Sequence, residues 1–324
     1  MAVADLFRTL GDRLNAAVLG QASLCERLLI ALLADGHVLL EGAPGLAKTR
    51  AVKTLAGLID GSFQRLQFTP DLLPADLTGS DIFQPQEGGF RFEPGPLFHN
   101  LILADEINRA PAKVQSALLE AMGERQISVG RRTYPLPEVF LVLATQNPIE
   151  HEGTYALPEA QLDRFMLFLR LDYPELAVEK EILALVRQEQ RAALGAVAGA
   201  GPAALLGSRE ILAARALVLD IHLAPALEDY IVRLVAATRR PESLVPELAG
   251  TVRFGASPRA AIALERGAKA RAWLDGRDYV SPGDIQVLAA DVLRHRLVLS
   301  YEAEAGGTTA DQVIAALVQK LPVP

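Results

Sequence analysis

The chain has 324 residues, of which 50% are hydrophobic and 22% are charged, and its formal net charge is −7 at pH 7. This length supports a large core and two domains, and the acidic balance argues against a broad nucleic-acid-binding surface. Cys25 is the single cysteine, the five histidines lack metal-ligand spacing, and no apolar run is long enough to span a bilayer. We therefore expect a cytoplasmic protein with neither a disulfide framework nor a cysteine metal site.

Up to about residue 172, short apolar runs alternate with helical segments. The predicted strands cover residues 38–40, 64–68, 101–104, 140–145 and 164–171, and the predicted helices include 23–34, 49–58 and 112–124. This alternation predicts an α/β fold, a mostly parallel sheet with helices on both faces and a ligand at the carboxyl ends of the strands. Two predicted hairpins interrupt it, at 83–92 and at 125–134, where the second turns near Gly130.

The remainder of the chain is predicted to be helical throughout. A helix over 174–190 leaves the α/β part, and residues 191–207 are poor in charge and rich in Ala and Gly, which indicates a linker. Apolar stripes from Leu227 and from Ile285 have helical spacing, and Ser257-Pro258 and Ser281-Pro282 are helix-start signals. We predict an α/β core over 1–198 and a smaller, all-helical lid over 208–324.

The segment 42–49 has the composition of a phosphate-binding loop. It reads Gly42-Ala43-Pro44-Gly45-Leu46-Ala47-Lys48-Thr49 and joins an apolar strand to a helix. Glycines let backbone N–H groups turn toward phosphate oxygens, a lysine can reach the outer phosphates, and a threonine can ligate Mg²⁺. Ala47 departs from the GxxxxGK[ST] pattern at its last glycine. A turn without any ligand, placed before a helix, is the alternative.

An acidic pair follows the apolar run 101–104. Asp105 is a candidate ligand for Mg²⁺, and Glu106 is a candidate base that would polarise the attacking water. A pair of acids that merely favours the start of a helix is the structural alternative. The position of the pair, after a phosphate loop and before a helix, favours catalysis.

Three further polar residues could act on a phosphoryl group. Asn147 follows the strand that ends at residue 145 and could orient water or phosphate, although asparagine is also common in turns before proline. Arg164 precedes the last predicted strand, and Arg259 lies in the first turn of a predicted helix. Arginine stabilises the charge that develops on a transferred phosphoryl group, whether it is supplied in cis or by a neighbouring subunit. The alternative for each arginine is a surface or packing role, and Arg164 could also simply pair with the neighbouring Asp163.

Taken in this order, these motifs resemble those of an AAA+ ATPase. Five segments resemble the MoxR family closely, and they are QFTPDLLPADLTG (67–79), DEINRAP (105–111), ATQNP (144–148), LPEAQLDRF (157–165) and SPGDI (281–285). The similarity runs from about Val18 to Leu299 and is interrupted at the linker. Ala47 before Lys48 also fits, because the family commonly reads GxxGxAKT.

The resemblance implies a role for each matching residue. Lys48, Thr49 and Arg50 join the loop in binding ATP, Thr49 and Asp105 hold Mg²⁺, and Glu106 is the catalytic base. Asn147 becomes sensor one, Arg164 a finger that acts in trans, and Arg259 sensor two. Val18, Leu19 and Gly20, with Gln21, match the segment that brackets adenine. The two hairpins match inserts that face a pore or a client. Phe90 and Phe92 are therefore candidate client contacts or hairpin packing residues. Arg109, outside the hairpins, is a candidate contact across subunits.

The resemblance also implies a ring, predicted to be a hexamer, that couples ATP hydrolysis to chaperone-like remodelling or maturation of a client protein. A partner with a von Willebrand factor A domain is implied, and neither stable nucleic-acid binding nor a membrane span is expected. A magnesium-chelatase ATPase subunit is the alternative within the fold. A nucleic-acid motor is disfavoured because no GAFTGA-like loop is present and Glu87 and Glu93 make the first hairpin acidic, although Arg125, Arg131 and Arg132 make the second basic. Glu106 and Arg164 argue against a non-hydrolysing, nucleotide-gated module.

Overall fold

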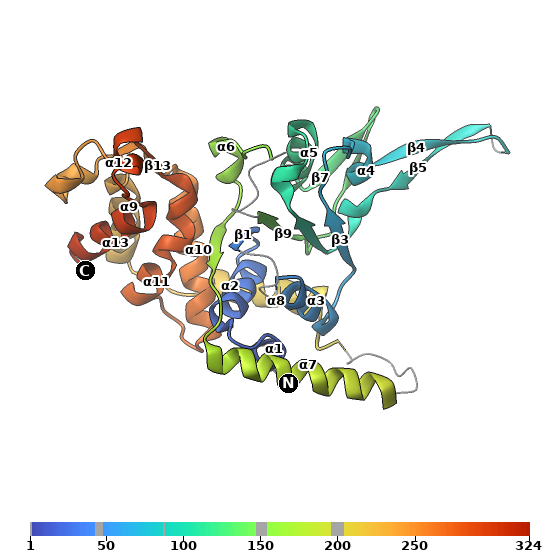
Figure 1. Cartoon of the computed structure of the whole chain (residues 1–324), viewed down its shortest axis with the longest axis horizontal. Coiled ribbons are helices and arrows are strands. Elements are labelled where there is room, and N and C mark those ends of the chain that lie inside the picture. Colours follow the sequence, from blue (N-terminus) through green and yellow to red (C-terminus); the bar gives the residue numbers. More distant parts are fainter. Residues whose placement is uncertain (1, 43–47, 87, 147–153, 196–203) are drawn as a thin grey trace. The chain divides into compact units, whose positions relative to one another are not determined.

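The computed structural model describes residues 2–42, 48–86, 88–146, 154–195 and 204–324 (Figure 1). Contacts between residues divide the chain into two units, which are described separately. Unit 1 consists of Met1–Leu29, Leu40–Tyr155 and Arg170–Leu212, and unit 2 consists of Ile30–Leu39, Ala156–Leu169 and Ala213–Pro324. The division at 1–198 and 208–324 stays a prediction. Within the described ranges, no helix combines the length and the hydrophobicity needed to cross a membrane.

A five-stranded sheet, in the order β10-β1-β9-β6-β3, forms the centre of the α/β part. Its strands are β1 (Val38–Gly42), β3 (Phe63–Gln67), β6 (Leu101–Asp105), β9 (Leu141–Gln146) and β10 (Leu167–Leu171). Strand β6 pairs in parallel with β3 and with β9, so that Leu101 lies opposite both Phe63 and Leu141. Every residue of β6 is buried, which explains why its sequence is a continuous apolar run. The predicted α/β fold with a parallel sheet is confirmed.

Four predicted strands match the structure within two residues, and the fifth was predicted to begin too early. Strand β10 begins at Leu167 and not at residue 164. The short helix α6 (Glu159–Leu162) precedes it, and the backbone N–H groups of Arg164 and Phe165 donate to carbonyls of α6. These turn hydrogen bonds keep Arg164 and Phe165 out of the sheet ladder.

The predicted helices of the first half are confirmed. They correspond to α2 (Ala22–Leu33), α3 (Lys48–Leu58) and α5 (Ala112–Glu124), and they are joined by α1 (Val3–Ala17) and the short α4 (Pro74–Thr78). Within unit 1, α3 contacts both α1 and β6. The chain then leaves the sheet through α7 (Leu176–Gly195), which ends five residues beyond its predicted boundary.

The predicted linker at 191–207 is wrong at both of its ends. Helix α7 continues to Gly195, because alanine is the strongest helix former and the segment 192–194 contains two of them. At the other end, β11 (Leu206–Gly207) pairs in parallel with β2 (Ile59–Asp60). Residues 196–203 lie outside the described part of the chain.

Both predicted hairpins are present. Strands β4 (Gly79–Gln84) and β5 (Gly89–Pro94) form an antiparallel arm that extends beyond the predicted 83–92, and β7 (Gln126–Val129) pairs with β8 (Arg132–Pro135). Gly79 at the base of the arm has a φ of +86°, and a Cβ there would lie 2.2 Å from the carbonyl oxygen of Glu93, so only glycine fits. Gly130 has a φ of +61° at the predicted turn.

Unit 2 is built mainly from helices. Their bounds are α8 (Ser208–Leu219, shared with unit 1), α9 (Pro225–Ala237), α10 (Pro258–Leu274), α11 (Pro282–Leu293), α12 (Tyr301–Ala305) and α13 (Ala310–Lys320). The predicted stripes on α9 and α11 are buried. The predicted caps are confirmed, since the Ser257 side chain accepts from the Arg259 N–H and Ser281 forms a capping box with Asp284.

The predicted helical lid is confirmed, although the second half is not helical throughout. Strand β12 (Val252–Phe254) pairs antiparallel with β13 (Val298–Leu299). The pairing satisfies backbone groups of two connecting segments that are far apart in sequence, which no local pattern could reveal. Short 3₁₀ turns complete the chain, at η1 (Pro96–Phe98), η2 (Ile107–Arg109), η3 (Pro241–Ser243), η4 (Pro246–Leu248) and η5 (Arg294–Arg296).

Candidate functional site

Polar side chains gather in unit 1 where the strands of the sheet end. Glu41 lies near the end of β1, Gln67 ends β3, Asp105 ends β6 and Gln146 ends β9. The Gln146 amide donates to the Glu41 carboxylate over 2.8 Å, and the Arg170 guanidinium donates to the same carboxylate over 3.1 Å. The carboxyl ends of parallel strands are where ligands bind in open α/β sheets. The sheet therefore gathers acids and amides at the edge that the sequence predicted.

Asp105 is held from both sides. The residue is only 6% exposed. One carboxylate oxygen accepts from Arg65 Nε over 2.7 Å, and the other accepts from the Thr145 hydroxyl over 3.2 Å. Arg65 lies on β3 two residues before Gln67, which is the register partner of Asp105. A buried carboxylate with its partners in place is a preorganised oxygen ligand for a hard cation such as Mg²⁺.

Glu106 leaves β6 in a strained backbone conformation. Its φ of +57° lies in the left-handed region, which residues other than glycine rarely adopt. The Glu106 N–H donates to the Thr145 hydroxyl over 2.9 Å, so Thr145 contacts both acids. The Glu106 carboxylate accepts from the Gln67 amide over 2.8 Å and from the Arg109 guanidinium over 3.1 Å. This arrangement orients a half-buried carboxylate beside Asp105.

Lys48 lies within electrostatic reach of these acids. It is the first residue of α3, and its Nζ donates to the carbonyl oxygen of Gly42 over 2.7 Å. Burial lowers the pKa of the Lys48 ammonium, and the charges of Asp105, Glu106 and Glu41 act against that shift. Strand β1 and helix α3 thus bring the predicted phosphate-binding lysine to the predicted metal ligand and base. Thr49 follows Lys48 in the first turn of the helix.

Several predicted site residues cannot be placed. Ala43, Pro44, Gly45, Leu46 and Ala47 of the phosphate loop lie outside the described residues, and so does Asn147. Gly42 is described as the last residue of β1 and supplies the carbonyl oxygen that accepts from Lys48. The roles of these residues stay predictions.

The predicted adenine-side segment packs against α7. Val18 is buried, and Gly20 has a φ of +75°, with the position of an added Cβ only 2.6 Å from Val178 Cγ1. Glycine is therefore required here both by conformation and by space. The Gln21 amide donates to the carbonyl oxygen of Asp172 over 3.3 Å. Leu19 lies between Val18 and Gly20 in the same turn.

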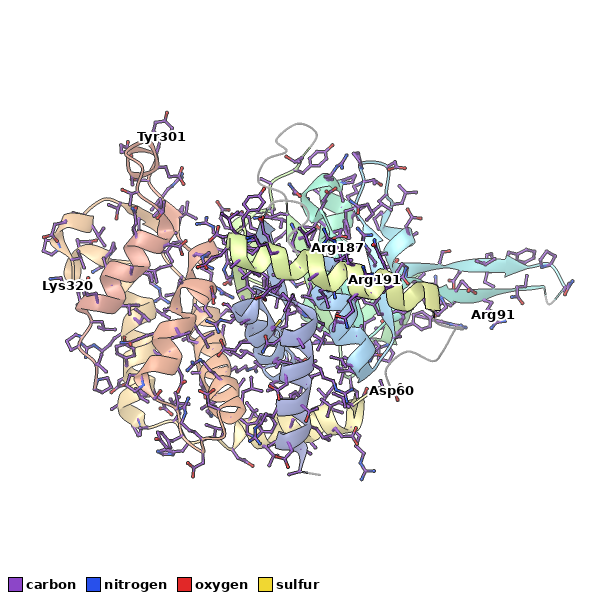
Figure 2. All side chains as sticks on the ribbon, turned by 60° about the horizontal axis from the view of Figure 1, so that its bottom comes forward. Asp60, Arg91, Arg187, Arg191, Tyr301 and Lys320 are labelled. Carbon is purple, nitrogen blue, oxygen red and sulfur yellow. The ribbon has the colours of Figure 1, made fainter. Side chains whose placement is uncertain are left out.

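Arg50 connects this segment to the helix of the phosphate loop. Its Nε donates to the carbonyl oxygen of Ala17 over 2.5 Å, and its two terminal nitrogens contact the Glu189 carboxylate of α7 over 2.5 and 3.0 Å. This hydrogen-bonded contact lowers the pKa of Glu189. Arg50 is thus observed as a link between α1, α3 and α7, and its predicted contact with ATP stays a prediction. Figure 2 shows Arg187 and Arg191 on the same helix α7.

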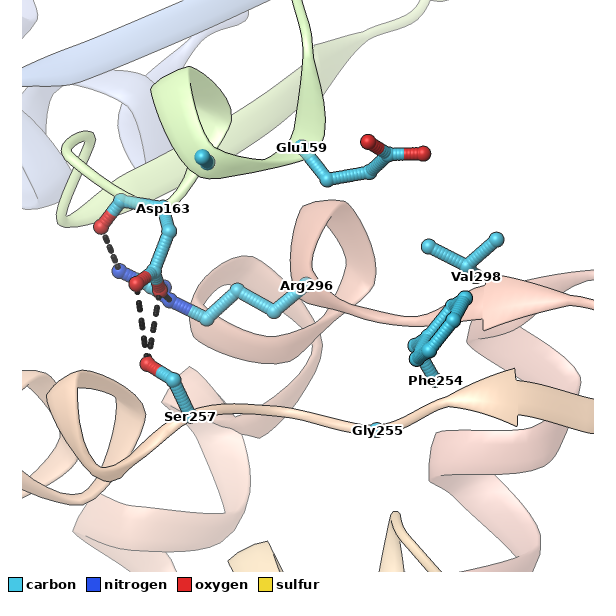
Figure 3. Close-up of a pocket in the computed structure, with 8 residues that line it drawn as sticks. Glu159, Asp163, Phe254, Gly255, Ser257, Arg296 and Val298 are labelled. Carbon is cyan, nitrogen blue, oxygen red and sulfur yellow. Dashed lines mark hydrogen bonds and ion pairs between the residues drawn. The ribbon is translucent and has the colours of Figure 1, made fainter.

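The two predicted arginines of unit 2 lie close to Asp163, Arg164 along the chain and Arg259 in space, and Asp163 forms an ion pair with the buried Arg296. Asp163, next to half-buried Arg164, accepts from Arg296 Nε over 2.8 Å and from the Ser257 hydroxyl over 2.9 Å (Figure 3). The exposed Arg259 reaches the same carboxylate over 3.5 Å. Sequence reasoning considered a local pairing of Asp163 with Arg164 and did not find its partners in the helical unit.

A cavity of about 390 Å³ opens beside this ion pair. Its lining combines the Asp163 and Arg296 pair with Glu159 and with the apolar side chains of Phe254 and Val298 (Figure 3). Burial lowers the pKa of Arg296, and its contact with Asp163 acts against that shift. A carboxylate neutralised in this way fixes the loop that carries Arg164 to the rest of unit 2.

Sequence reasoning missed Arg65, Gln67 and Thr145 as partners of the acids. A weak signal existed, because Arg65 and Gln67 are polar residues two apart within a predicted strand and therefore share one of its faces. Nothing in the sequence indicated which face looks toward β6. No cluster of three or more metal-ligating side chains occurs in the described part of the chain.

Comparison with known proteins agrees with this geometry. Residues 37–167 match the model of the ATPase family associated with various cellular activities (AAA), and residues 248–317 match the AAA lid domain. Chaperone MoxR1 of Mycobacterium tuberculosis is 47% identical over 95% of this chain and 79% of its own, and protein MoxR of Paracoccus denitrificans is 37% identical over 98% and 96%. A crystal structure of a candidate ATPase from Cytophaga hutchinsonii superposes with a TM-score of 0.91 at 45% identity, covering 99% of this chain and 96% of that one.

Proposed function

Because this chain belongs to the MoxR family of AAA+ ATPases, we propose that it hydrolyses ATP to ADP and phosphate at the carboxyl edge of its sheet. The observation that supports this proposal is that Lys48 lies within electrostatic reach of Asp105 and Glu106 in unit 1. A lysine for phosphates, a ligand for metal and a base beside it are the parts that phosphoryl transfer needs.

The proposed roles follow from the contacts of each residue. Thr49 and Asp105 offer the oxygen atoms that Mg²⁺ prefers, and the bound ion would neutralise charge on the phosphates. The Glu106 carboxylate would accept a proton from the attacking water. Gln67 and Arg109 now occupy one oxygen of that carboxylate, so they would orient Glu106 when water approaches. Lys48 would donate to the outer phosphates, with Gly42–Ala47 as the backbone cradle.

We also propose that the working form is a ring, predicted to be a hexamer, in which Arg164 completes the site of a neighbouring subunit. Arg259 would act as sensor two, and Asn147 as sensor one. An arginine supplied in trans raises the rate of phosphoryl transfer about 10³–10⁵-fold in related chemistry. A single subunit would then bind ATP and cleave it slowly.

The client-facing element of this proposal is the arm formed by β4 and β5. Phe83 and Phe90 contact each other, with ring centroids 5.3 Å apart, and are 52% and 70% exposed. Phe92, in contrast, stacks on Tyr134 of β8 at 4.0 Å. A two-stranded ribbon with exposed aromatic residues is suited to contact an apolar segment of another protein. We therefore propose Phe83 and Phe90 as client contacts and assign Phe92 to the packing of the arm. Arg91, labelled in Figure 2, lies between Phe90 and Phe92 in the chain.

We propose chaperone-like remodelling as the task because a relative 47% identical is named a chaperone. A partner with a von Willebrand factor A domain remains part of the proposal from family resemblance. Crosslinking from a photoreactive residue at position 90, in the ATP-bound state, tests whether the arm contacts a second protein. Crosslinks to a second protein are expected at position 90 and not at position 92, and equal yields at both would contradict the assignment of the arm.

The Glu106→Gln variant tests the hydrolytic role. Retained binding of a fluorescent ATP analogue and a 10²–10⁴-fold loss of phosphate release are expected. Glu120→Gln, on the exposed face of α5, is the matched control and should hydrolyse ATP at the normal rate. An unchanged rate in Glu106→Gln would contradict the assignment of the base, and strong stimulation of the unaltered protein by DNA would favour a nucleic-acid motor.

Mixing two inactive variants tests whether Arg164 acts in trans. Glu106→Gln keeps Arg164, and Arg164→Ala keeps Glu106, so a mixed ring contains sites with both groups. Partial recovery of phosphate release on mixing is expected. A mixture as inactive as its components would show that both groups must lie in one subunit.

A further inference from the structure

Gln115 is a buried amide in the middle of α5 and plays no part in the site described above. The residue is 1% exposed, and it lies among the buried apolar side chains Val114, Leu118 and Met122 of the same helix. Among the glutamines that the structure describes, the others are all half-buried or exposed. A buried amide is unfavourable unless its hydrogen bonds are satisfied, so its partners indicate what it does.

The Gln115 amide nitrogen contacts three backbone carbonyl oxygens. It lies 3.2 Å from each of the oxygens of Ile107, Ala110 and Tyr155. Ile107 begins the 3₁₀ turn that directly follows Glu106 and contains Arg109, and Ala110 directly follows that turn. Tyr155 belongs to a different part of the chain, the segment between β9 and α6. One side chain thus ties the turn after the proposed base to the segment that follows the end of β9.

The backbone reinforces the same junction. The Tyr155 N–H donates to the carbonyl oxygen of Asn108 over 2.6 Å. Along the chain, Tyr155 precedes Arg164 by nine residues. The turn that directly follows Glu106 and contains Arg109 is therefore joined to the stretch of chain that continues toward the proposed trans-acting arginine.

This junction also bears on the strained conformation of Glu106. A residue with a φ of +57° keeps that conformation only where its surroundings hold it. On the strand side, Thr145 accepts from the Glu106 N–H. On the turn side, the hydrogen bonds of Gln115 fix the carbonyls of Ile107 and Ala110. Without the amide the Ala110 carbonyl would lose this donor, and the Ile107 carbonyl would keep only the Ala110 N–H, so the turn would be held less firmly.

We propose that Gln115 is a positioning residue for ATP hydrolysis, which holds Glu106 and Arg109 in place against the Tyr155 segment and sets the rate of cleavage without setting the affinity for nucleotide. The proposal rests on the proposed function of Glu106. Gln115 touches neither nucleotide nor water in it. A shift of the base by about 1 Å is enough to slow a reaction by roughly 100-fold.

Gln115→Met tests the proposal, because methionine fills a similar volume and has no amide. Phosphate release is expected to fall 10–100-fold, while the dissociation constant of a fluorescent ATP analogue changes less than about threefold. Met122→Leu, a conservative change at a buried apolar position of the same helix, is the control and should stay within about twofold in both measurements. Normal phosphate release in Gln115→Met, or an equal loss of affinity and rate, would overturn the proposal.

Gln115→Glu adds a measurement, the pH dependence of turnover, that a merely structural role of Gln115 would leave unchanged. A protonated carboxyl group can donate to one of the three carbonyls, whereas a carboxylate repels them all, and burial raises the pKa of such a group. The turnover of Gln115→Glu relative to the unaltered protein should therefore rise as the pH is lowered from about 8 to about 6. The same ratio for Gln115→Met should stay flat, and a flat ratio in both variants would count against the proposal.

Hydrogen exchange separates this inference from the proposed function. In Gln115→Met, backbone amides of residues 107–110 and 154–156 should exchange faster than in Met122→Leu, whether or not ATP is hydrolysed. If the unaltered protein released no phosphate, the proposed function would fail while this result could still stand. Unchanged exchange in both segments would overturn the positioning role alone.

Discussion

Asp105 and Glu106 in unit 1 and Asp284 in unit 2 differ in how far their arginine partners are exposed. In unit 1, Asp105 is paired with Arg65 and Glu106 with Arg109, and these arginine side chains are 53% and 41% exposed. Such partners can turn toward water, or toward a phosphate, at little cost in free energy. The contacts of the two acids are therefore suited to exchange during a reaction cycle.

In unit 2 the corresponding contacts are buried and numerous. The side chain of Asp284 has no exposed surface, and it accepts from Arg271 over 2.5 Å and from Arg277 over 2.7 Å. The Ser281 N–H and hydroxyl also donate to it, each over 2.7 Å. Burial alone would raise the pKa of Asp284, but the hydrogen bonds from Arg277 and Ser281 outweigh it and lower the pKa to about 2. The ion pairs of Asp284 with Arg271 and Arg277 are therefore fixed structural contacts of unit 2.

The largest expected effect on stability is that of Asp284→Ala. Removing the carboxylate leaves two arginines without their buried partner, and a loss of about 3–5 kcal/mol in the free energy of unfolding is expected, measured by urea denaturation. Asp275→Ala is the control, because Asp275 is 45% exposed and its ion pair is worth little. A loss below about 1 kcal/mol in Asp284→Ala would mean that the buried ion pairs of Asp284 contribute no more to stability than exposed ones.

Acid should weaken unit 2 through the same residue. The pKa of Asp284 falls from 3.8 to about 2 on folding, so its ionised form stabilises the folded state. That contribution, about 2 kcal/mol, is fully present above pH 4 and is lost as the pH falls toward 2. The difference in unfolding free energy between the unaltered protein and Asp284→Asn should narrow over this range, and a constant difference would contradict the assignment.

Asp105→Asn should separate activity from stability. Asparagine keeps the shape of the side chain and can still accept from the Thr145 hydroxyl, and the half-exposed Arg65 can be solvated. We expect the free energy of unfolding to change by less than about 1 kcal/mol. Phosphate release should nevertheless fall at least about 100-fold. A large loss of stability with little loss of activity would place Asp105 with the structural carboxylates.

The smallest effect is expected for Glu189→Gln. Its partner Arg50 is 33% exposed and Glu189 itself 50%, so the ion pair is open to water and to salt. We expect a loss of less than about 0.5 kcal/mol at low ionic strength, and none at high ionic strength, in parallel urea denaturation curves. A salt-independent loss would mean that Arg50 holds α1, α3 and α7 together more firmly than its exposure indicates.

The sequence predicted elements with local signals well. Helix α5 has its predicted bounds of 112–124, and the hairpin of β7 and β8 turns at Gly130 as expected. Errors occurred where structure depends on distant partners. The strands β11 and β12 are too short to have a periodic pattern of their own, and they form because β2 and β13 offer backbone partners.

The candidate site shows the same division. Lys48, Asp105 and Glu106 were predicted as site residues because their residue types follow strands in a recognisable order, and their roles stay predictions. Arg65 and Gln115 were not found, because a polar residue within a strand or a helix has no local signature of the carbonyl or carboxylate that it will meet. Asn147 and the loop 43–47 lie outside the described residues, and their roles stay predictions.

The sequence by itself therefore determined the class of fold, the family, and the order of the chemical groups along the chain, since these depend on periodicity and on motifs of a few residues. Only the tertiary structure decided which groups contact the acids, namely Thr145 for Asp105 and Glu106 and Arg296 for Asp163, and which carbonyls Gln115 meets. The physical reason is that a hydrogen bond is set by distance and direction in space, and the residues that share one here are separated by up to 133 positions in the chain.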